Sequence, residues 1–157
     1  MQSPIVSAVT AADRAPLESM LRSIVEFDAG EVAVALELID SAIASADDYR
    51  VLVARAGTDP TGYVCFGPTP MTRGTYDLYW IASAPEARRT GVGRALVAAL
   101  DVELRAASAR LVRVETSSRD DYASTRGFYD RVGFQKVATI PAFYDVEDDL
   151  LIYARYY

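Results

Sequence analysis

The chain has 157 residues, 51% of them hydrophobic and 24% charged, which fits one globular domain over residues 1–157 with a substantial core. Its formal net charge of −6 argues against nucleic acid as a partner, since phosphates attract Lys and Arg, and fits a cationic or amine-bearing ligand better. The sequence has no histidine and one cysteine, which excludes a His-based triad, a His metal site and an internal disulfide and leads us to expect no metal.

The N-terminus lacks the basic and apolar regions of a signal peptide, and no apolar run reaches the ~18 residues of a membrane span. We therefore expect a cytoplasmic protein that does not bind membranes. The pattern then predicts a strand over residues 5–9, a helix that Thr10 caps with Asp13 in a capping box, and a second helix over residues 29–44. The joint between these helices, residues 26–30, is acidic.

The rest of the chain alternates between strands and helices. Strands are expected at residues 49–56, 62–67, 75–82, 110–116, 134–140 and 150–156, the first two as a hairpin about a turn at 57–60. Helices are expected at residues 90–107 and 121–132, the second closed by Gly133. This order predicts an α/β fold with a mixed sheet covered by helices, including a right-handed crossover through the 90–107 helix.

Residues 88–94, Arg-Arg-Thr-Gly-Val-Gly-Arg, lie between an expected strand and an expected helix. The start of a helix leaves amide N–H groups without internal partners and carries a positive dipole end, so it attracts anions. Gly91 and Gly93 lack a Cβ and would let phosphate oxygens approach the backbone, while the three arginines add positive charge. The pattern therefore favours a pyrophosphate cradle over a glycine turn with solvated arginines.

The spacing of Arg88, Gly91 and Gly93 differs from the Rossmann and P-loop motifs and matches the Arg/Gln-x-x-Gly-x-Gly/Ala signature of the GCN5-related N-acetyltransferase (GNAT) superfamily. Residues 77–82 resemble the fourth strand of that family. Residues 128–134, Phe-Tyr-Asp-Arg-Val-Gly-Phe, resemble its Phe-Tyr-x-x-x-Gly-Phe motif. The resemblance covers essentially the whole chain. It implies one GNAT domain, with a mostly antiparallel sheet of about seven strands and about four flanking helices.

The resemblance also implies acetyl-CoA as the co-substrate, with its pantetheine arm between the fourth and fifth strands where these splay at a bulge. Ile81 and Ser83 would offer backbone groups to the pantetheine. The residues implied at the pyrophosphate are Arg88, Arg89, Thr90, Gly91, Val92, Gly93 and Arg94. Many members carry Asn seven residues before the acid tyrosine, where this chain has Tyr122. Ser124 or Thr125 is therefore expected to take that contact.

The reaction implied by the resemblance is direct attack of an amine on the thioester, without an acyl-enzyme. The amine must lose a proton, and the leaving thiolate benefits from a proton donor. Tyr129 stands at the position of the family's acid tyrosine. Asp77 is the candidate base, because some histone acetyltransferases of this superfamily place a catalytic Glu there. Glu115 on the neighbouring strand is its rival, and an exposed strand carboxylate is the plain alternative. Cys65 has no histidine to activate it and is expected to be inert.

Substrate pockets in this superfamily lie between the first two helices and the loop that joins the last two strands. Here those segments are residues 26–31 and 142–149, and both are acidic. The residues expected at the acceptor are Glu26, Phe27, Phe143 and Tyr144. Aromatic walls with carboxylates suit a small cation, so we expect a small amine or amino-acid-like acceptor. The alternative is that both segments are solvated surface loops.

Other functions remain open at this point. The chain could be a non-catalytic module that binds acyl-CoA, transfer a longer acyl group, or acetylate a protein lysine or N-terminus. The intact glycines and Tyr129 favour catalysis over binding alone. A dimer through the C-terminal strands is common among proteins that the chain resembles. The Tyr-rich end, residues 153–157, is compatible with such a homodimer.

Overall fold

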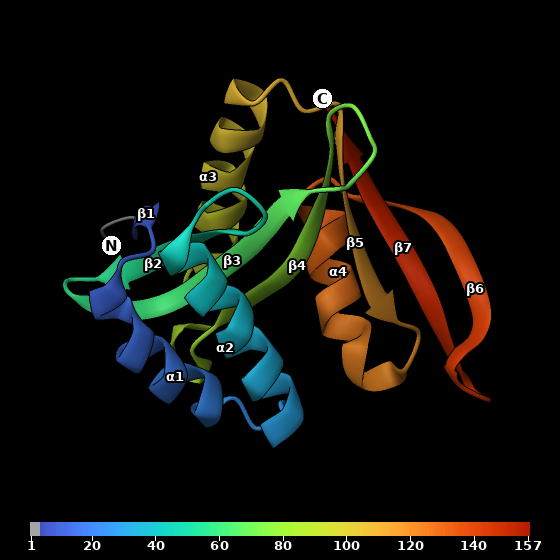
Figure 1. Ribbon diagram of the computed structural model, residues 1–157. Coiled ribbons are helices and arrows are strands. Elements are labelled where there is room, and N and C mark those ends of the chain that lie inside the picture. Colours follow the sequence, from blue (N-terminus) through green and yellow to red (C-terminus); the bar gives the residue numbers. More distant parts are fainter. Residues whose placement is uncertain (1–3) are drawn as a thin grey trace.

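The computed structural model describes residues 4–157, and one seven-stranded sheet forms its centre (Figure 1). The strands lie in the order β1-β2-β3-β4-β5-β7-β6. Their bounds are β1 Ile5–Ala8, β2 Arg50–Ala56, β3 Asp59–Pro68, β4 Thr75–Ser83, β5 Leu111–Ser117, β6 Gln135–Asp145 and β7 Asp148–Tyr156. The helices are α1 Arg14–Ser23, α2 Ala29–Ala44, α3 Val92–Ala106 and α4 Ala123–Arg131. The mixed sheet with flanking helices that the sequence predicts is confirmed.

The sheet is antiparallel at every junction except one. Strands β4 and β5 pair in parallel, and α3 is the crossover that joins them. A parallel pair needs such a crossover because the chain must return to the same end of the sheet. The single parallel junction therefore lies where helix α3 begins, directly after β4.

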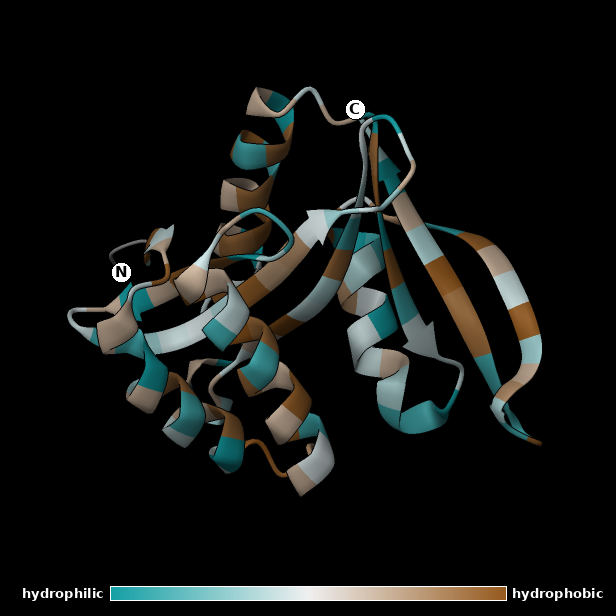
Figure 2. Cartoon of the chain, viewed as in Figure 1, coloured by the Kyte–Doolittle hydropathy of each residue, from teal (hydrophilic) through white to brown (hydrophobic). Residues whose placement is uncertain are grey.

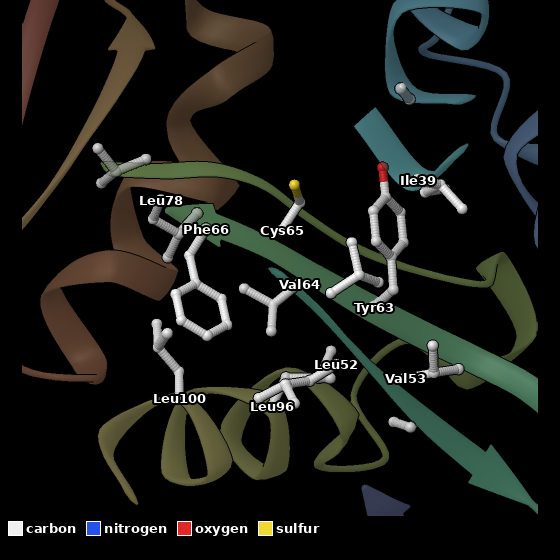
Figure 3. Close-up of a cluster of buried hydrophobic side chains, with 14 of the residues drawn as sticks. Ile39, Leu52, Val53, Tyr63, Val64, Cys65, Phe66, Leu78, Leu96 and Leu100 are labelled. Carbon is white, nitrogen blue, oxygen red and sulfur yellow. The ribbon is translucent and has the colours of Figure 1, made fainter. Parts of the chain in front are cut away.

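Helices cover both faces of the first half of the sheet. Successive side chains of a strand point to opposite faces, and β3 demonstrates this alternation. Tyr63 and Cys65 point towards α2, whereas Val64 and Phe66 point towards α3, where Leu100 meets them (Figure 3). All of these side chains are fully buried. Strand β3 is thus the central strand of a core with a helical layer on each side.

The distribution of hydrophobic residues follows this layering (Figure 2). The central strands are largely hydrophobic, whereas the helices alternate between hydrophobic and hydrophilic residues. In α3 the buried side is formed by Val92, Leu96, Val97, Leu100 and Leu104. None of the helices within residues 4–157 is both long and apolar enough to cross a bilayer.

The segment between the last two strands differs from the sequence prediction. Residues 142–149 were expected to form a loop, but β6 continues to Asp145 and β7 begins at Asp148. The sequence predicts a strand that stops at Ile140, directly before Pro141, which lacks the N–H that a ladder needs. Strand β6 is an edge strand, where proline is tolerated, and its register shifts between Ile140 and Asp145. Phe143 and Tyr144 therefore lie on an irregular strand rather than on a loop.

Smaller differences occur at the ends of other elements. Helix α3 begins at Val92, two residues after the expected start, because Gly91 adopts the left-handed φ of 92° and serves as the N-cap. The helix expected from residue 121 starts as a 3₁₀ turn over Asp120–Tyr122. The capping box of Thr10 and Asp13 is confirmed, with the Thr10 N–H donating to Asp13 at 2.7 Å.

Candidate active site

Strands β4 and β5 separate soon after they begin. They pair only over residues 75–77 of β4 and 111–113 of β5. Tyr79 is an extra residue on β4 that faces no residue of β3, which makes a β-bulge that bends the strand. Over residues 78–83, which include Ile81 and Ser83, β4 has β3 on one edge and no described strand on the other. Backbone groups along that edge are therefore available to a ligand.

A cavity of about 140 Å³ opens where the two strands separate. Its walls come from both strands: Asp77, Leu78, Tyr79, Arg113, Val114 and Glu115. Tyr79 packs edge-on against Tyr49, with ring centroids 5.2 Å apart. Burial and then the negative charge of Asp77 raise the pKa of Tyr79 to about 12, so its phenol is neutral at physiological pH. Both carboxylates expected as bases thus line one cavity.

Arg113 joins the two candidate carboxylates. Its Nε lies 2.5 Å from Asp77 Oδ1, and its Nη1 lies 3.0 Å from Glu115 Oε1. The hydroxyl of Thr69 donates to Asp77 Oδ2 at 2.8 Å, so both oxygens of this buried carboxylate are occupied. Glu115 is exposed and keeps one oxygen without a partner among the described residues. The two carboxylates are therefore chemically different, although they share one guanidinium.

The segment before α3 is a tight turn, in which the N–H groups of Arg88 and Thr90 donate to the carbonyls of Pro85 and Ala87, both at 3.3 Å. Arg89 and Gly91 have φ angles of 64° and 92°, which alternate with right-handed or extended neighbours. Such alternation favours an anion site, for which the N–H groups of Gly91 and of the first turn of α3 remain, since the Thr90 N–H is already bonded. Gly91 provides no side-chain cap, and the first-turn N–H groups of a helix have no internal partner. The Thr90 hydroxyl instead donates to the Ala87 carbonyl at 2.6 Å, which closes the turn.

The two glycines of this segment serve different purposes. A Cβ on Gly91 would meet nothing within 4 Å, so its role is to adopt the left-handed backbone. A Cβ on Gly93 would lie 3.0 Å from the Phe128 ring, so its role is to let α4 approach α3 closely. The packing of Phe128 thus gives a second reason for glycine at position 93, and the contact of both glycines with phosphate stays a prediction.

The acidic joint between α1 and α2 contacts this segment directly. Arg88 donates two hydrogen bonds to Glu26, at 2.8 Å and 3.0 Å, and this ion pair lowers the pKa of the Glu26 carboxyl. The next residue, Phe27, packs edge-on against Trp80 of β4, with ring centroids 5.2 Å apart. The structure thus brings two residues expected at the acceptor against the segment expected to hold the coenzyme.

Tyr129 lies in α4 within a group of aromatic rings. The rings of Phe128, Phe134 and Tyr153 have centroids 5.6 to 5.9 Å from its own. Burial raises the pKa of Tyr129 well above its usual range. Its phenol is therefore protonated at any physiological pH and is able to donate a hydrogen bond.

The second pair expected at the acceptor, Phe143 and Tyr144, lies near the end of β6. Phe143 and Tyr144 pack edge-on with centroids 5.0 Å apart, and both are exposed. Burial, followed by the charges of Glu115 and Asp148, raises the pKa of Tyr144. Burial and the charge of Glu31 do the same for Tyr122. Aromatic and acidic groups from α2, β5, β6 and β7 therefore face one region.

A larger hollow, of about 380 Å³, lies elsewhere in the molecule. It is lined by β1, β2 and the C-terminal parts of α2 and α3, and its only charged walls are Arg50 and Glu103. These two residues form an ion pair with each other. No residue of the β4–β5 cavity or of the segment before α3 lines it. The larger hollow therefore lies apart from the residues that the sequence predicts for the coenzyme and the base.

The chain was compared with known families and structures. Residues 47–136 match the model of the acetyltransferase (GNAT) domain, which covers more than half of the chain. A GNAT-family protein from Desulfovibrio desulfuricans is 38% identical, with 98% of this chain and 99% of that chain covered and a TM-score of 0.93.

The chain belongs to the GNAT acetyltransferase family.

More distant GNAT-like structures share the fold. The ribosomal-protein-S18-alanine N-acetyltransferase from Escherichia coli is 19% identical, with a TM-score of 0.77 over 97% of this chain and 92% of that one. The PaiA N-acetyltransferase from Thermoplasma acidophilum, in complex with coenzyme A, is 15% identical, with a TM-score of 0.77 over 99% and 100%. No protein with curated function is significantly similar in sequence.

Within this GNAT fold, the structure places two expected residues of α4 and two groups that sequence reasoning did not identify. Ser124 and Thr125 lie in the first turn of α4, where no side chain caps the helix. Arg113 was missed, although its position two residues before Glu115 on one strand places both on the same face. Asp148 is buried and accepts a hydrogen bond from Ser117, which no local pattern signals.

Proposed function

We propose that this GNAT protein is a single catalytic domain over residues 1–157 that transfers an acetyl group from acetyl-CoA to a small amine or amino-acid-like acceptor. The observation that supports this most is the separation of β4 from β5, together with the first turn of α3, whose N–H groups have no side-chain cap. A free strand edge suits an amide-bearing chain, and these N–H groups suit a diphosphate. The free edge of β4 and the start of α3 follow each other in the chain, because β4 ends at Ser83 and α3 begins at Val92.

The coenzyme would contact the protein at three places. The free edge of β4, with Ile81 and Ser83, binds the pantetheine amides, and Ser124 or Thr125 of α4 lies on the other side. The pyrophosphate contacts are Arg88, Arg89, Thr90, Gly91, Val92, Gly93 and Arg94. When bound, acetyl-CoA supplies the activated thioester. The protein orients the thioester and the acceptor, and its side chains accept and donate the protons.

Replacing Gly91 by alanine tests the cradle. A non-glycine residue with left-handed φ costs about 1–2 kcal/mol, so alanine shifts the backbone that carries the N–H groups at the start of α3. We expect coenzyme A affinity in calorimetry to fall about tenfold, which corresponds to about 1.4 kcal/mol. Gly57→Ala is the matched control, because Gly57 has φ of 63° and equally open surroundings at the distant β2–β3 turn. Equal coenzyme affinity in both variants would contradict the cradle.

The lining of the β4–β5 cavity favours one of the two candidate bases, and the motif position favours the acid. Glu115 accepts a proton from the acceptor ammonium at its free oxygen, and the neutral amine then attacks the thioester carbonyl carbon. Asp77 is less suited to this role, because both of its oxygens are occupied by Arg113 and Thr69. Asp77 acts as a positioning residue that holds Arg113, and it is the rival base if a water carries the proton. Tyr129 donates from its phenol oxygen to the departing sulfur. No acyl-enzyme is needed, because Cys65 is fully buried and burial raises its pKa to about 12.

The acceptor is proposed to lie between the α1–α2 joint and the β6–β7 hairpin. Glu26 and Phe27 line one side, and Phe143 and Tyr144 line the other, with Glu31 and Asp148 nearby. Carboxylates beside aromatic faces favour a cationic group of small size. This supports an amine over an alcohol or a neutral acceptor.

An assay of thiol release across a library of acceptors tests this function. We expect turnover with small amines or amino-acid-like compounds when acetyl-CoA is the donor. Acetylation of peptides or alcohols alone would contradict the proposed acceptor. Coenzyme binding without turnover on any acceptor would instead indicate a non-catalytic module. A preference for longer acyl donors would revise the donor but leave the site unchanged.

The β6 edge supports a homodimer. Val137, Ile140 and Phe143 are exposed on this edge strand, and an unpaired apolar edge tends to pair with another chain. Sedimentation is expected to give a dimer for the native chain and a monomer for Ile140→Lys. Val102→Lys is the control, because Val102 is exposed on α3. A monomeric native chain at tens of micromolar would reject the dimer.

A further inference from the structure

Two residues with separate proposed roles are bound to each other in this structure. Arg88 belongs to the segment proposed to hold the coenzyme, and Glu26 belongs to the joint proposed to meet the acceptor. They lie 62 positions apart in the chain, yet two hydrogen bonds of 2.8 Å and 3.0 Å join their side chains. While this pair exists, the guanidinium cannot bind phosphate with the same two donors, and the carboxylate cannot bind an ammonium in the same way.

The environment of this ion pair makes an exchange of partners easy. The side chains of Arg88 and Glu26 are 45% and 54% exposed. Exposed pairs contribute little net stability, because water solvates the separated charges well. The ion pair of Arg55 with Asp13 contrasts with it, since those side chains are only 14% and 7% exposed. A phosphate accepts the same two-pronged contact from arginine as a carboxylate does, and a diphosphate carries more charge.

The joint stays in place without the Arg88 contact. Phe27 packs on Trp80 of β4, and its N–H donates to the Ile24 carbonyl at 3.1 Å. Asp28 and Glu31 form a capping box that fixes the start of α2. These contacts flank Glu26 on the C-terminal side and do not involve Arg88. The Glu26 carboxylate is therefore able to change partner while the backbone around it remains fixed.

We propose that Arg88 transfers from Glu26 to the coenzyme diphosphate, and that Glu26 thereby becomes free to bind the ammonium group of the acceptor. This inference rests on the proposed function, because it uses the same coenzyme and acceptor sites. It makes Glu26 a specificity residue that is masked until the donor is bound. The acceptor then binds productively only after the coenzyme, and futile binding of acceptor to the empty enzyme is disfavoured.

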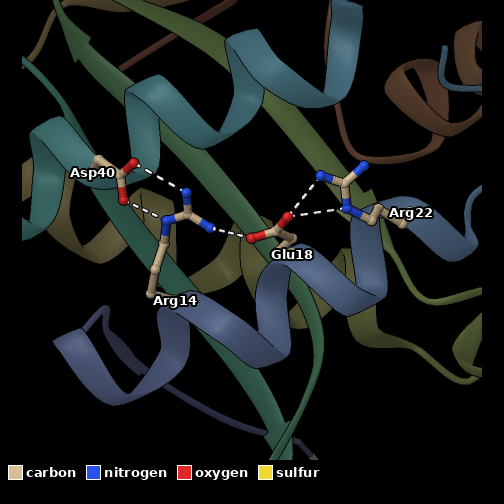
Figure 4. A network of polar contacts seen from close by, with 4 residues as sticks. All are labelled: Arg14, Glu18, Arg22 and Asp40. Carbon is tan, nitrogen blue, oxygen red and sulfur yellow. Dashed lines mark hydrogen bonds and ion pairs between the residues drawn. The ribbon is translucent and has the colours of Figure 1, made fainter. Parts of the chain in front are cut away.

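The carboxyl pKa of Glu26 reports the exchange without any turnover. In the free protein, Arg88 is the charged side chain that faces Glu26 and lowers its pKa. Losing this partner raises the pKa towards its ordinary value. We expect NMR titration of the carboxyl carbons to give a higher pKa for Glu26 with coenzyme A than without it. Glu18, whose pKa is lowered by Arg22 and Arg14 on the outer side of α1, is the internal control and keeps its low value (Figure 4).

Coenzyme affinities provide a second test. Glu26→Gln removes the competitor for Arg88, so coenzyme A should bind about two- to fivefold more tightly. Arg88→Gln should weaken binding, and the double variant should match Arg88→Gln, because no competition remains. Glu18→Gln should leave the affinity unchanged. Unchanged or weaker binding in Glu26→Gln, or a Glu26 pKa that stays low with coenzyme bound, would overturn the exchange. Failure of the native chain to bind coenzyme A would instead reject the proposed function.

Discussion

Tyr129→Phe should lose about a hundredfold or more in kcat while keeping its affinity for coenzyme A. A positioned proton donor contributes about 10²–10⁴ in rate, and this substitution removes only the hydroxyl. The ring remains packed among Phe128, Phe134 and Tyr153, so the fold and the coenzyme path are retained. Single-turnover rates with acetyl-CoA, together with calorimetry for coenzyme A, separate the two quantities.

Tyr153→Phe is the matched control for that variant. Tyr153 is buried in the same aromatic group, 5.9 Å from Tyr129 between ring centroids, and has no role in the proposed chemistry. Its substitution should leave kcat within a few fold. An unchanged rate in Tyr129→Phe would remove Tyr129 from the acid role, and equal losses in both variants would indicate a packing effect.

The high pKa of Tyr129 adds a pH dependence with a definite sign. Burial raises the pKa of its phenol above the ordinary value of about 10. The phenol therefore stays protonated as the pH rises through the range in which an exposed tyrosine ionises. The rate should show no alkaline loss attributable to this residue up to about pH 10. An alkaline loss below about pH 10 that disappears in Tyr129→Phe would contradict the raised pKa.

Glu115→Gln should produce the second large effect, a loss of about a hundredfold or more in kcat/KM. Glutamine keeps the shape of the side chain and its contact with Arg113 but cannot accept the proton of an ammonium. The loss should be greatest at low pH, where little acceptor is deprotonated in solution, and it should shrink as the pH approaches the acceptor's own pKa. A pH series of initial rates measures this difference.

Two further variants make the assignment of the base decisive. Glu103→Gln alters a carboxylate that is also partly exposed and also paired with an arginine, but it lies beside the distant hollow and should have no effect. Asp77→Asn should cost less than Glu115→Gln, because Asp77 acts through Arg113. A greater loss in Asp77→Asn would reverse the two roles and make Asp77 the base.

Much of this architecture could be predicted from local sequence patterns. Helix α2 has the expected bounds of residues 29–44. Its apolar face and its capping residues are close together in the sequence, so a local pattern is enough to predict them. Gly91 was identified because a glycine at a helix start carries a strong local signal. The position of Tyr129 likewise came from a short motif, residues 128–134, that covers the end of α4 and the turn after it. In each case the deciding interactions are a few residues apart.

The sequence could not indicate interactions between distant segments. The Arg88–Glu26 pair joins residues from different layers, and nothing in either segment selects the other as partner. The role of Gly93 depends on Phe128, which only the packing of α4 on α3 brings close. Strand β6 extends past Pro141 because it is an edge strand, a property of sheet order rather than of local composition.

The most direct test of the central claim is the location of coenzyme A on the protein in solution. Backbone amide shifts in a ¹⁵N-labelled chain, recorded during titration with coenzyme A, report this location without an acceptor. We predict that the largest shifts fall on residues 89–94 at the start of α3 and on residues 78–83 along the free edge of β4. Shifts confined to the 380 Å³ hollow around Val51 and Val102, or no shifts at millimolar coenzyme, would contradict it.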